Sequence, residues 1–148
     1  MNSSQLRVLL DTNVILDVLL QRQPWVREAA EIWQAVDEGR LAGFLPASAL
    51  TDIYYVARRL TNPTRARKSV RVCLAAFEFC SVDRPLLERA YSLDGQDFED
   101  DLQIACAESS GLVAIVTRDV DGFIGSSIEV WTPAQCCQKL SMSADSQC

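Results

Sequence analysis

The sequence predicts an α/β fold with a mostly parallel sheet, because short apolar runs alternate with longer stretches of helical periodicity. Two of these runs, residues 6–10 and 112–116, are almost uniformly apolar, which is typical of strands covered on both faces. The chain has 148 residues, of which 49% are hydrophobic, as expected for one domain with a single core. We therefore expect one domain over residues 1–140 and a flexible tail over residues 141–148.

The apolar runs and helical patterns follow each other in a regular order. The expected strands are residues 6–10, 41–45, 79–82, 112–116 and 128–131, and the expected helices are residues 13–20, 26–38, 47–60, 64–77, 85–93 and 98–110. Turn residues mark several boundaries. Pro24 stands near the start of the second helix and Gly39 just past its end, Asn62 and Pro63 separate the third and fourth helices, and Gly111 closes the sixth.

Composition excludes several classes of function. The chain contains no histidine, so it has no His-based triad, no paired-histidine ribonuclease chemistry and no His-containing zinc site. The net charge of −6 means that binding to nucleic acid would need a local basic patch. The apolar runs are far shorter than the roughly 20 residues of a membrane helix, and the N-terminus lacks a signal-peptide pattern. We expect a soluble protein in the cytoplasm.

The six cysteines are expected to be reduced. None forms a C-x-x-C pair, and three stand inside apolar runs, where a free thiol behaves as a small hydrophobic side chain. They are Cys73, Cys80, Cys106, Cys136, Cys137 and Cys148.

Several aspartates are placed where parallel strands end. Asp11 ends the first strand, Asp119 follows the run 112–116 by three residues, and Asp52 stands early in the helix that follows residues 41–45. Ligands of open parallel sheets bind beyond the carboxyl ends of the strands, so these acids are expected at one edge. Each also has a simpler explanation as a strand end, a cap or a partner of a helix dipole.

The helix at residues 98–110 carries a second group of acids. Asp97 is its expected N-cap, with Asp100 three residues further on as in a capping box. The expected core stripe is Phe98, Leu102, Ala105 and Cys106, with Asp97, Asp100, Asp101 and Ile104 in the sector beside it. Carboxylates that converge repel one another unless a cation binds, and oxygen ligands without His or Cys favour Mg²⁺ or Mn²⁺. Such a metal activates water without a histidine base.

Four segments resemble, in order, those of PIN-domain ribonucleases, most closely the VapC-type toxins. They are "LLDTNVILDVLL", "SALTDIYYVARRL", "DFEDDLQIACAESSG" and "AIVTRDVDGF…SSIEVWTP", and the resemblance covers about residues 6–138. It implies a three-layer α/β/α sandwich and a Mg²⁺- or Mn²⁺-dependent acidic site that hydrolyses RNA phosphodiester bonds. It also implies a small antitoxin protein as partner and a possible homodimer, although nothing inside the chain indicates either.

The resemblance assigns roles to individual residues. The metal ligands would be Asp11, Asp100 and Asp119, whereas Asp101 stands where relatives commonly carry Ala. Asp52 replaces the Glu of many relatives, and its shorter side chain would reach the metal only through water. The supporting residues would be Thr12 and Asn13 in the turn after the first strand, and Asp97 and Asp121, which are also explained as a cap and a loop residue.

A basic segment follows the second strand. Six of the 14 basic residues lie within 14 positions, namely Arg58, Arg59, Arg65, Arg67, Lys68 and Arg71. They form either a solvated helix face or a track for the RNA backbone. The aromatic residues Trp25, Trp33, Tyr54 and Tyr55 are expected in the core or in an interface rather than as platforms for base stacking.

Two other functions are weighed against the nuclease. A haloacid-dehalogenase-like phosphatase also places Asp at the end of its first strand, but it normally needs D-x-D, and Asn13 stands at the second position. A non-catalytic PIN module that binds RNA or protein typically lacks the first or third acid, and here both Asp11 and Asp119 are present. The sequence therefore favours an active nuclease.

Overall fold

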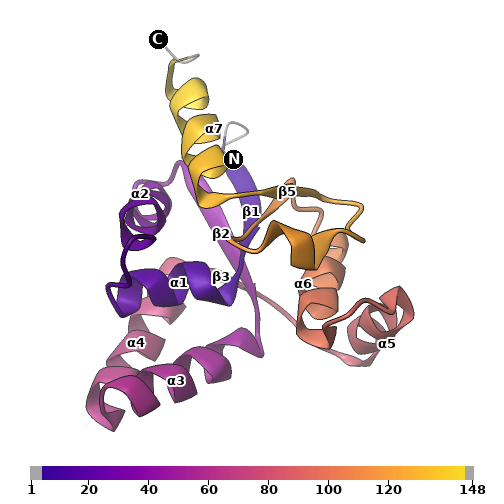
Figure 1. Cartoon of the computed structure of the whole chain (residues 1–148), viewed down its shortest axis with the longest axis horizontal. Coiled ribbons are helices and arrows are strands. Elements are labelled where there is room, and N and C mark those ends of the chain that lie inside the picture. The colour runs from indigo at the N-terminus through magenta and orange to yellow at the C-terminus, as the bar shows by residue number, and fades with distance from the viewer. Residues whose placement is uncertain (1–4, 146–148) are drawn as a thin grey trace.

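The computed structural model describes residues 5–145 and has a five-stranded, all-parallel sheet with helices on both faces (Figure 1). The strands are β1 (Leu6–Leu10), β2 (Leu41–Pro46), β3 (Glu78–Cys80), β4 (Ala114–Val116) and β5 (Glu129–Trp131). The helices are α1 (Thr12–Leu19), α2 (Val26–Asp37), α3 (Ala49–Leu60), α4 (Pro63–Ala76), α5 (Arg84–Leu93), α6 (Phe98–Ser109) and α7 (Pro133–Asp145), with a 3₁₀ turn η1 (Val120–Phe123). The predicted α/β class and parallel sheet are confirmed.

The order of the strands places a crevice beside β1. The sheet runs β3-β2-β1-β4-β5, so the chain builds outward from β1 to β3 and then crosses to the other side of β1. Ligands of open α/β sheets bind at such a switch point, beyond the carboxyl ends of the strands. Leu10 is paired in register with Val116, so the residues that follow β1 and β4 begin side by side.

Two cores, one on each face of the sheet, make the three layers. Val8 and Leu10 point to one face and pack with residues of α1, α2 and α7. Leu9 and Ile115 point to the opposite face and pack with α5 and α6. In Figure 1 these two groups of helices flank the sheet on opposite sides. Alternate residues of one strand thus fill both cores, as its uniformly apolar sequence predicts.

Helix α6 departs from its predicted packing at one position. Leu102, Ala105 and Cys106 are buried as expected, whereas Phe98 is 49% exposed. The reason is that burial of α6 begins only at Asp101, and residues 101–107 are then all buried, including those beside the expected stripe. Phe98 stands in the first turn, before this buried stretch.

Helix α7 is not among the expected helices. It packs against α2, and its residues Cys136 and Leu140 are buried. It continues through residues 141–145 of the expected tail, whereas residues 146–148, which include Cys148, lie outside the described residues. The other five cysteines are free thiols, as predicted. No helix among the described residues is long and apolar enough to span a membrane.

Candidate functional site

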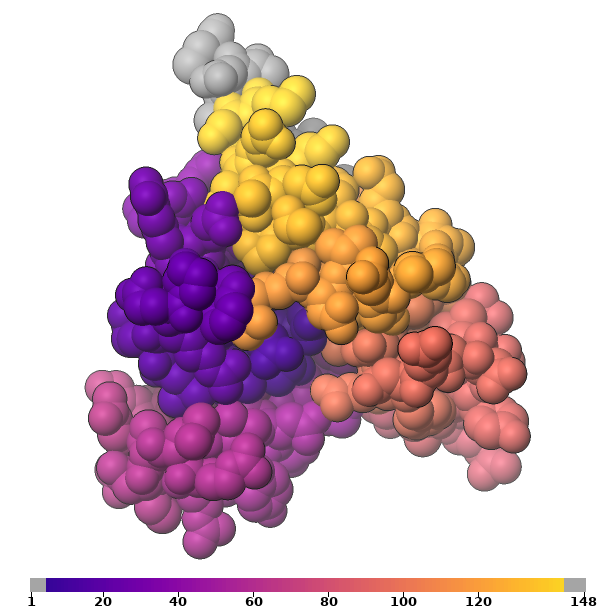
Figure 2. Space-filling view, in the orientation of Figure 1, coloured from indigo at the N-terminus to yellow at the C-terminus, as the bar shows by residue number. Residues whose placement is uncertain are grey.

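A cavity of about 460 Å³ lies at the carboxyl ends of β1 and β4, between α3 and α6. In the space-filling view it corresponds to the notch between the magenta surface of α3 and the coral surface of α6 (Figure 2). Its lining residues are Asp11, Thr12, Asn13, Leu16, Asp52, Tyr55, Val56, Arg59, Asp97, Glu99, Asp100, Gln103 and Asp119. Six carboxylates and one guanidinium therefore share one cavity.

Asp11 is held inside this cavity. It occupies the N-cap position of α1, but its side chain makes no capping hydrogen bond. Its carboxylate instead accepts hydrogen bonds from Thr117 Oγ1 at 2.8 Å and from Gln103 Nε2 at 3.3 Å, and the residue is 8% exposed. The carboxylate at the end of the first strand is thus positioned by two neighbouring segments and is not a helix cap.

The loop after β4 positions Asp119. The backbone N–H of Asp119 donates to Thr117 Oγ1 at 3.0 Å, so one hydroxyl connects this loop to Asp11. Arg118 donates two hydrogen bonds, of 2.7 and 3.0 Å, to Asp17 of α1, a side chain only 1% exposed. The Arg118 guanidinium also lies 3.9 Å from the ring centroid of Trp25. The loop is therefore tied to α1.

The first turn of α6 brings Asp100 to Asp119. Asp97 is the N-cap, as predicted, and accepts from the backbone N–H groups of Glu99 and Asp100 at 2.8 and 3.2 Å. A Cβ placed on Gly122 would lie 2.8 Å from Asp100 Oδ2 and 3.1 Å from Asp119 Oδ2. The two carboxylates thus approach the backbone of η1 together, at a glycine.

Burial together with electrostatic repulsion in the cavity raises the pKa values of two acids. Partial burial, followed by the charges of Asp97, Asp11, Asp119 and Glu99, raises the pKa of Asp100 to about 7. Partial burial, followed by Asp52, Asp97 and Asp11, also raises the pKa of Glu99. Acids from four segments therefore affect one another, and a bound cation would relieve their repulsion.

The residues of the cavity fit a hydrated divalent cation. Carboxylate oxygens are the donors that Mg²⁺ and Mn²⁺ prefer, and Mg²⁺ usually keeps several waters and few carboxylate ligands. Gln103, which is 3% exposed, has a buried Oε1 without a hydrogen-bond partner, and a metal-bound water would satisfy it. Among the described residues no three His, Cys, Asp or Glu side chains could hold a metal ion as they stand, so waters would complete the coordination.

The other predicted acids and the turn residues have different surroundings. Asp52 lines the cavity from the first turn of α3. Asp101 is buried and accepts the backbone N–H of Gly95 at 2.9 Å, outside the lining of the cavity. Asp121 is exposed in η1 and does not line the cavity. Thr12 and Asn13 do line it, and Asn13 Oδ1 accepts from Arg22 at 3.3 Å.

The basic segment divides into three groups. Arg59 lines the acidic cavity, whereas Arg65 and Lys68 line a separate groove of about 200 Å³ beside the end of α1. The remaining three, which are Arg58, Arg67 and Arg71, are exposed and line neither.

The aromatic residues also differ in their surroundings. Trp33 packs edge-on against Phe77 in the core, with ring centroids 4.8 Å apart, and Tyr54 is half-buried. Trp25 is 41% exposed beneath Arg118. Tyr55 is 63% exposed and lines the cavity, so of the two expected positions, core or interface, it does not occupy the core.

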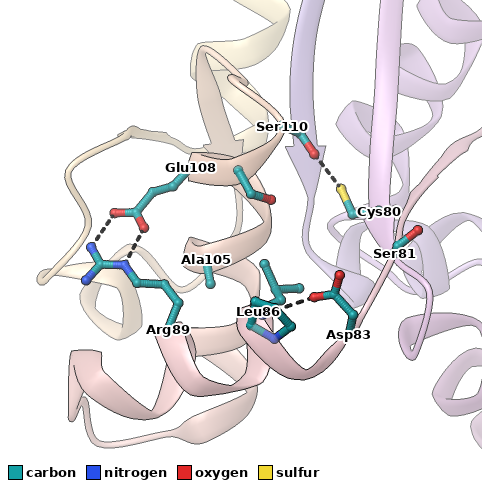
Figure 3. Close-up of a pocket in the computed structure, with 10 residues that line it drawn as sticks. Cys80, Ser81, Asp83, Leu86, Arg89, Ala105, Glu108 and Ser110 are labelled. Carbon is teal, nitrogen blue, oxygen red and sulfur yellow. Dashed lines mark hydrogen bonds and ion pairs between the residues drawn. The ribbon is translucent and has the colours of Figure 1, made fainter.

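A second cavity, of about 540 Å³, lies between α5, α6 and the end of β3 (Figure 3). Its charged side chains are paired. Arg89 donates to Glu108 at 3.0 and 3.1 Å, and Asp83 accepts the backbone N–H of Leu86 as the N-cap of α5. Hydrogen bonds from Cys106 and then Ser110 hold the pKa of the Cys80 thiol at about 6, despite its burial. The larger cavity thus lacks the unpaired acids of the smaller one.

Three residues that support the acidic site were not predicted from the sequence. Glu99 and Gln103 lie on α6, and Gln103 is three residues after Asp100, a spacing that places both on one helix face. Thr117 is the last residue before Arg118, and its hydroxyl is the contact between Asp11 and the β4 loop. Helical spacing could have identified Gln103 from the sequence. It could not have identified Thr117, because the position of Thr117 beside Asp11 depends on the register of β1 and β4.

The chain was compared with known protein sequences and structures. No curated protein sequence matches the chain. The structure is similar to the DNA-bound VapBC from Salmonella typhimurium, with a TM-score of 0.67 and 18% identity over 87% of this chain and 99% of that one. A toxin-antitoxin complex from Klebsiella pneumoniae gives 0.64 and 22% over 85% and 97%. VapC20 from Mycobacterium tuberculosis, described as a Sarcin-Ricin loop cleaving toxin, gives 0.61 and 13% over 73% and 86%.

These similarities confirm that the chain has the fold of the VapC structures, with the three layers that the resemblance implied. A match to a family model by sequence includes both Asp11, which follows β1, and Asp119, in the loop after β4. A family model described as PIN domain matches residues 7–121. The chain belongs to the PIN domain family.

Proposed function

We propose that this protein is a ribonuclease that hydrolyses RNA phosphodiester bonds with a Mg²⁺ or Mn²⁺ ion bound at the acidic cavity. The observation that carries the proposal is the convergence of Asp11, Asp100 and Asp119 from separate segments at the switch point of the sheet. The chain has no histidine that could act as a base, so metal-activated water is the chemistry that these residues support.

Each residue of the cavity has a distinct role in this proposal. Asp11, Asp100 and Asp119 would hold the ion, in part through bound waters, and the ion when bound would activate water and neutralise phosphate charge. Thr117 and Gln103 fix the Asp11 carboxylate by hydrogen bonds at 2.8 and 3.3 Å. Asp52 would act through a water molecule because its side chain is short.

The surroundings of the cavity supply further roles. Thr12 and Asn13 begin α1 directly after Asp11 and line the cavity, and Asp97 caps α6 and so fixes the turn that carries Asp100. Asp121 would contribute only from outside the cavity lining, in the loop after Asp119. The exposed basic residues of α3 and α4 would contact the RNA backbone.

The structural relatives support a proposal for the biological role. The Salmonella and Klebsiella structures are a VapBC complex and a toxin-antitoxin complex, and VapC20 is described as cleaving the sarcin-ricin loop. We therefore propose a cytoplasmic toxin that a small antitoxin holds inactive and that forms a homodimer. A non-catalytic PIN module is the alternative, but the filled acidic positions favour catalysis. The family match disfavours a phosphatase.

Incubation of the purified protein with single-stranded and structured RNA tests the proposal. We expect cleavage with Mn²⁺ and none in EDTA or with Asp11→Asn. The matched control is Asp37→Asn, an exposed residue of α2 outside the cavity, which should retain full activity. Asp52→Ala should lose about 10- to 100-fold, less than Asp100→Ala, as is typical of a group that acts through water. Cleavage that survives EDTA or Asp11→Asn would contradict the metal mechanism.

A further inference from the structure

One wall of the acidic cavity has a chemistry that metal binding does not explain. It is the face of α3 formed by Asp52, Tyr55, Val56 and Arg59, whose spacing of three, four and seven residues places them in one row along the helix. Beyond Asp52 this row is aromatic, apolar and cationic. The opposite wall, on α6, carries only polar and acidic side chains, namely Asp97, Glu99, Asp100 and Gln103.

Tyr55 presents an open ring to the cavity. It is 63% exposed, and its ring packs edge-on against Tyr54, with centroids 5.3 Å apart and an interplanar angle of 79°. This contact orients the ring without covering it. Tyr91 on α5 is more exposed, at 79%, but lines none of the described cavities, so it is an internal comparison for Tyr55.

Arg59 is a cation without an ion pair in the described part of the chain, although it shares a cavity with six carboxylates. A guanidinium that is not neutralised by its neighbours is available for a phosphate, which it can bind through two parallel N–H groups. One turn of helix separates Arg59 from Tyr55, so an aromatic face and a phosphate donor stand next to each other at the rim of the site.

We propose that Tyr55 and Arg59 form a nucleotide subsite beside the metal-binding acids, in which one base stacks on the Tyr55 ring and an adjacent phosphate binds Arg59. The identity of the ligand as RNA rests on the proposed ribonuclease function. A base reaches an aromatic ring only when it is unstacked and unpaired, so the subsite selects a splayed nucleotide of a single strand or loop. Tyr55 and Arg59 thereby position the chain relative to the acids.

Binding in EDTA tests this subsite separately from cleavage. The probe is a five-nucleotide single-stranded RNA with 2-aminopurine at its centre, whose fluorescence falls when the base stacks. The variants are Tyr55→Ala, Tyr55→Phe and Arg59→Gln, with Tyr91→Ala and the exposed α2 residue Arg27→Gln as matched controls. All four positions are exposed, so melting temperatures should confirm that the five variants fold.

We expect Tyr55→Ala to weaken binding about 5- to 150-fold and to remove the quenching, as loss of one stacked base does elsewhere. Tyr55→Phe should stay within about twofold, because the ring is kept. Arg59→Gln should flatten the dependence of log K on log salt by about 0.7, the value for one phosphate contact on a single strand. Both control variants should bind as the wild type does.

An RNA with an abasic site in place of 2-aminopurine completes a double-mutant cycle. Because the base is then absent, Tyr55→Ala should cost no more than about twofold on this RNA. An equal loss on both RNAs, or no loss on either, would overturn the subsite even if the protein cleaves RNA. Tyr55-dependent quenching by a protein that never cleaves with Mn²⁺ would leave the subsite standing and overturn the nuclease.

Discussion

Aspartates that are close together in the sequence have different contacts in this protein, because different groups lie next to each of them. In the first turn of α6, Asp97 caps the helix, Asp100 points into the cavity and Asp101 is buried against the backbone of Gly95. The sequence predicts the cap, because cap spacing is local. Helical angle alone places Asp97, Asp100 and Asp101 in one sector, and only the family resemblance separates Asp101 from the expected ligands. The sequence does not predict the partner of Asp101, since Gly95 belongs to the preceding loop.

The raised pKa of Asp100 gives a test at this scale. A carboxyl group whose pKa is about 7 in the folded protein and 3.8 in the unfolded chain keeps its proton only when folded between these values. The metal-free wild type should therefore lose stability as the pH rises from about 4 to 7. Asp100→Asn removes this loss, so in EDTA at pH 8 it should be more stable than the wild type, by roughly 1 kcal/mol after allowance for solvent screening.

Urea denaturation in EDTA at pH 5 and pH 8 measures this difference. The advantage of Asp100→Asn over the wild type should be larger at pH 8 than at pH 5, and Asp37→Asn, on the surface of α2, should show no such trend. A variant less stable than the wild type at pH 8 would mean that the carboxylates do not repel one another in the folded protein.

Gln103 allows a second prediction at the residue scale. Its Nε2 holds Asp11, and its buried Oε1 has no partner in the described structure. Gln103→Leu removes the orphaned carbonyl but also the hydrogen bond to Asp11, and these opposed effects should leave the free energy of unfolding of the metal-free protein within about 1 kcal/mol of the wild type. If a metal-bound water is the missing partner, the variant should bind Mn²⁺ about 10- to 100-fold more weakly. Equal shifts in melting temperature with Mn²⁺ for variant and wild type would exclude this role.

At the scale of elements, helices with a clear sequence pattern are predicted. A helix whose start is marked only by one capping contact is missed. The six predicted helices are present, whereas α7 was missed although its start carries a Thr-x-x-Gln capping box. In the structure Thr132 Oγ1 accepts from the backbone of Gln135, and Gln135 Oε1 accepts from the backbone of Thr132. This capping box is the local signal that could have identified α7 from the sequence.

The connection between α1 and the β4 loop can be tested directly. Asp17 is 1% exposed and accepts two hydrogen bonds from Arg118, which immediately precedes Asp119. Asp17→Asn leaves the guanidinium without its counter-charge and should lower the free energy of unfolding by about 3 kcal/mol. Cleavage should fall as well, because the loop that holds Asp119 loosens.

Thermal and urea denaturation measure the stability of Asp17→Asn, and Mn²⁺ titration of the remaining folded protein reports on the site. The exposed Asp37→Asn should change the free energy of unfolding by no more than about 0.5 kcal/mol. A comparably small effect of Asp17→Asn would show that the loop is held by its other contacts.

Helix α4 carries a prediction about RNA affinity. Replacing Arg65, Lys68 and Arg71 by Gln should weaken binding to long single-stranded RNA and reduce the salt dependence by about 0.7 for each lost phosphate contact. The matched control replaces Arg27 and Arg84, which are exposed on α2 and α5. Metal affinity should not change. An unchanged salt slope would identify this part of α4 as an ordinary solvated helix face.

At the scale of the whole molecule, strand order is what gathers the site. Alternating strands and helices predict a parallel sheet, and the rule on carboxyl ends predicts that Asp11 and Asp119 approach each other. The two acids are neighbours, however, only because β1 and β4 are adjacent strands of the sheet. Sequence periodicity does not determine the order of the strands. For the same reason Thr117 and Glu99 were not predicted, because their roles exist only once β4 and α3 are placed. The sequence thus locates the acids better than their supports.

The same assembly implies that a metal ion should stabilise the entire fold. The acids come from β1, α3, α6 and the β4 loop, so the site exists only in the folded protein. A ligand that binds only the folded state adds about 2.7 kcal/mol at 100 times its Kd, which for this size corresponds to roughly 5–10 °C in Tm. Mn²⁺ should therefore raise the Tm of the wild type, whereas Asp11→Asn should gain much less. Thermal melts with Mn²⁺ and with EDTA test this, and NaCl at equal ionic strength controls for charge screening. An equal gain for wild type and Asp11→Asn would place the ion elsewhere on this acidic protein.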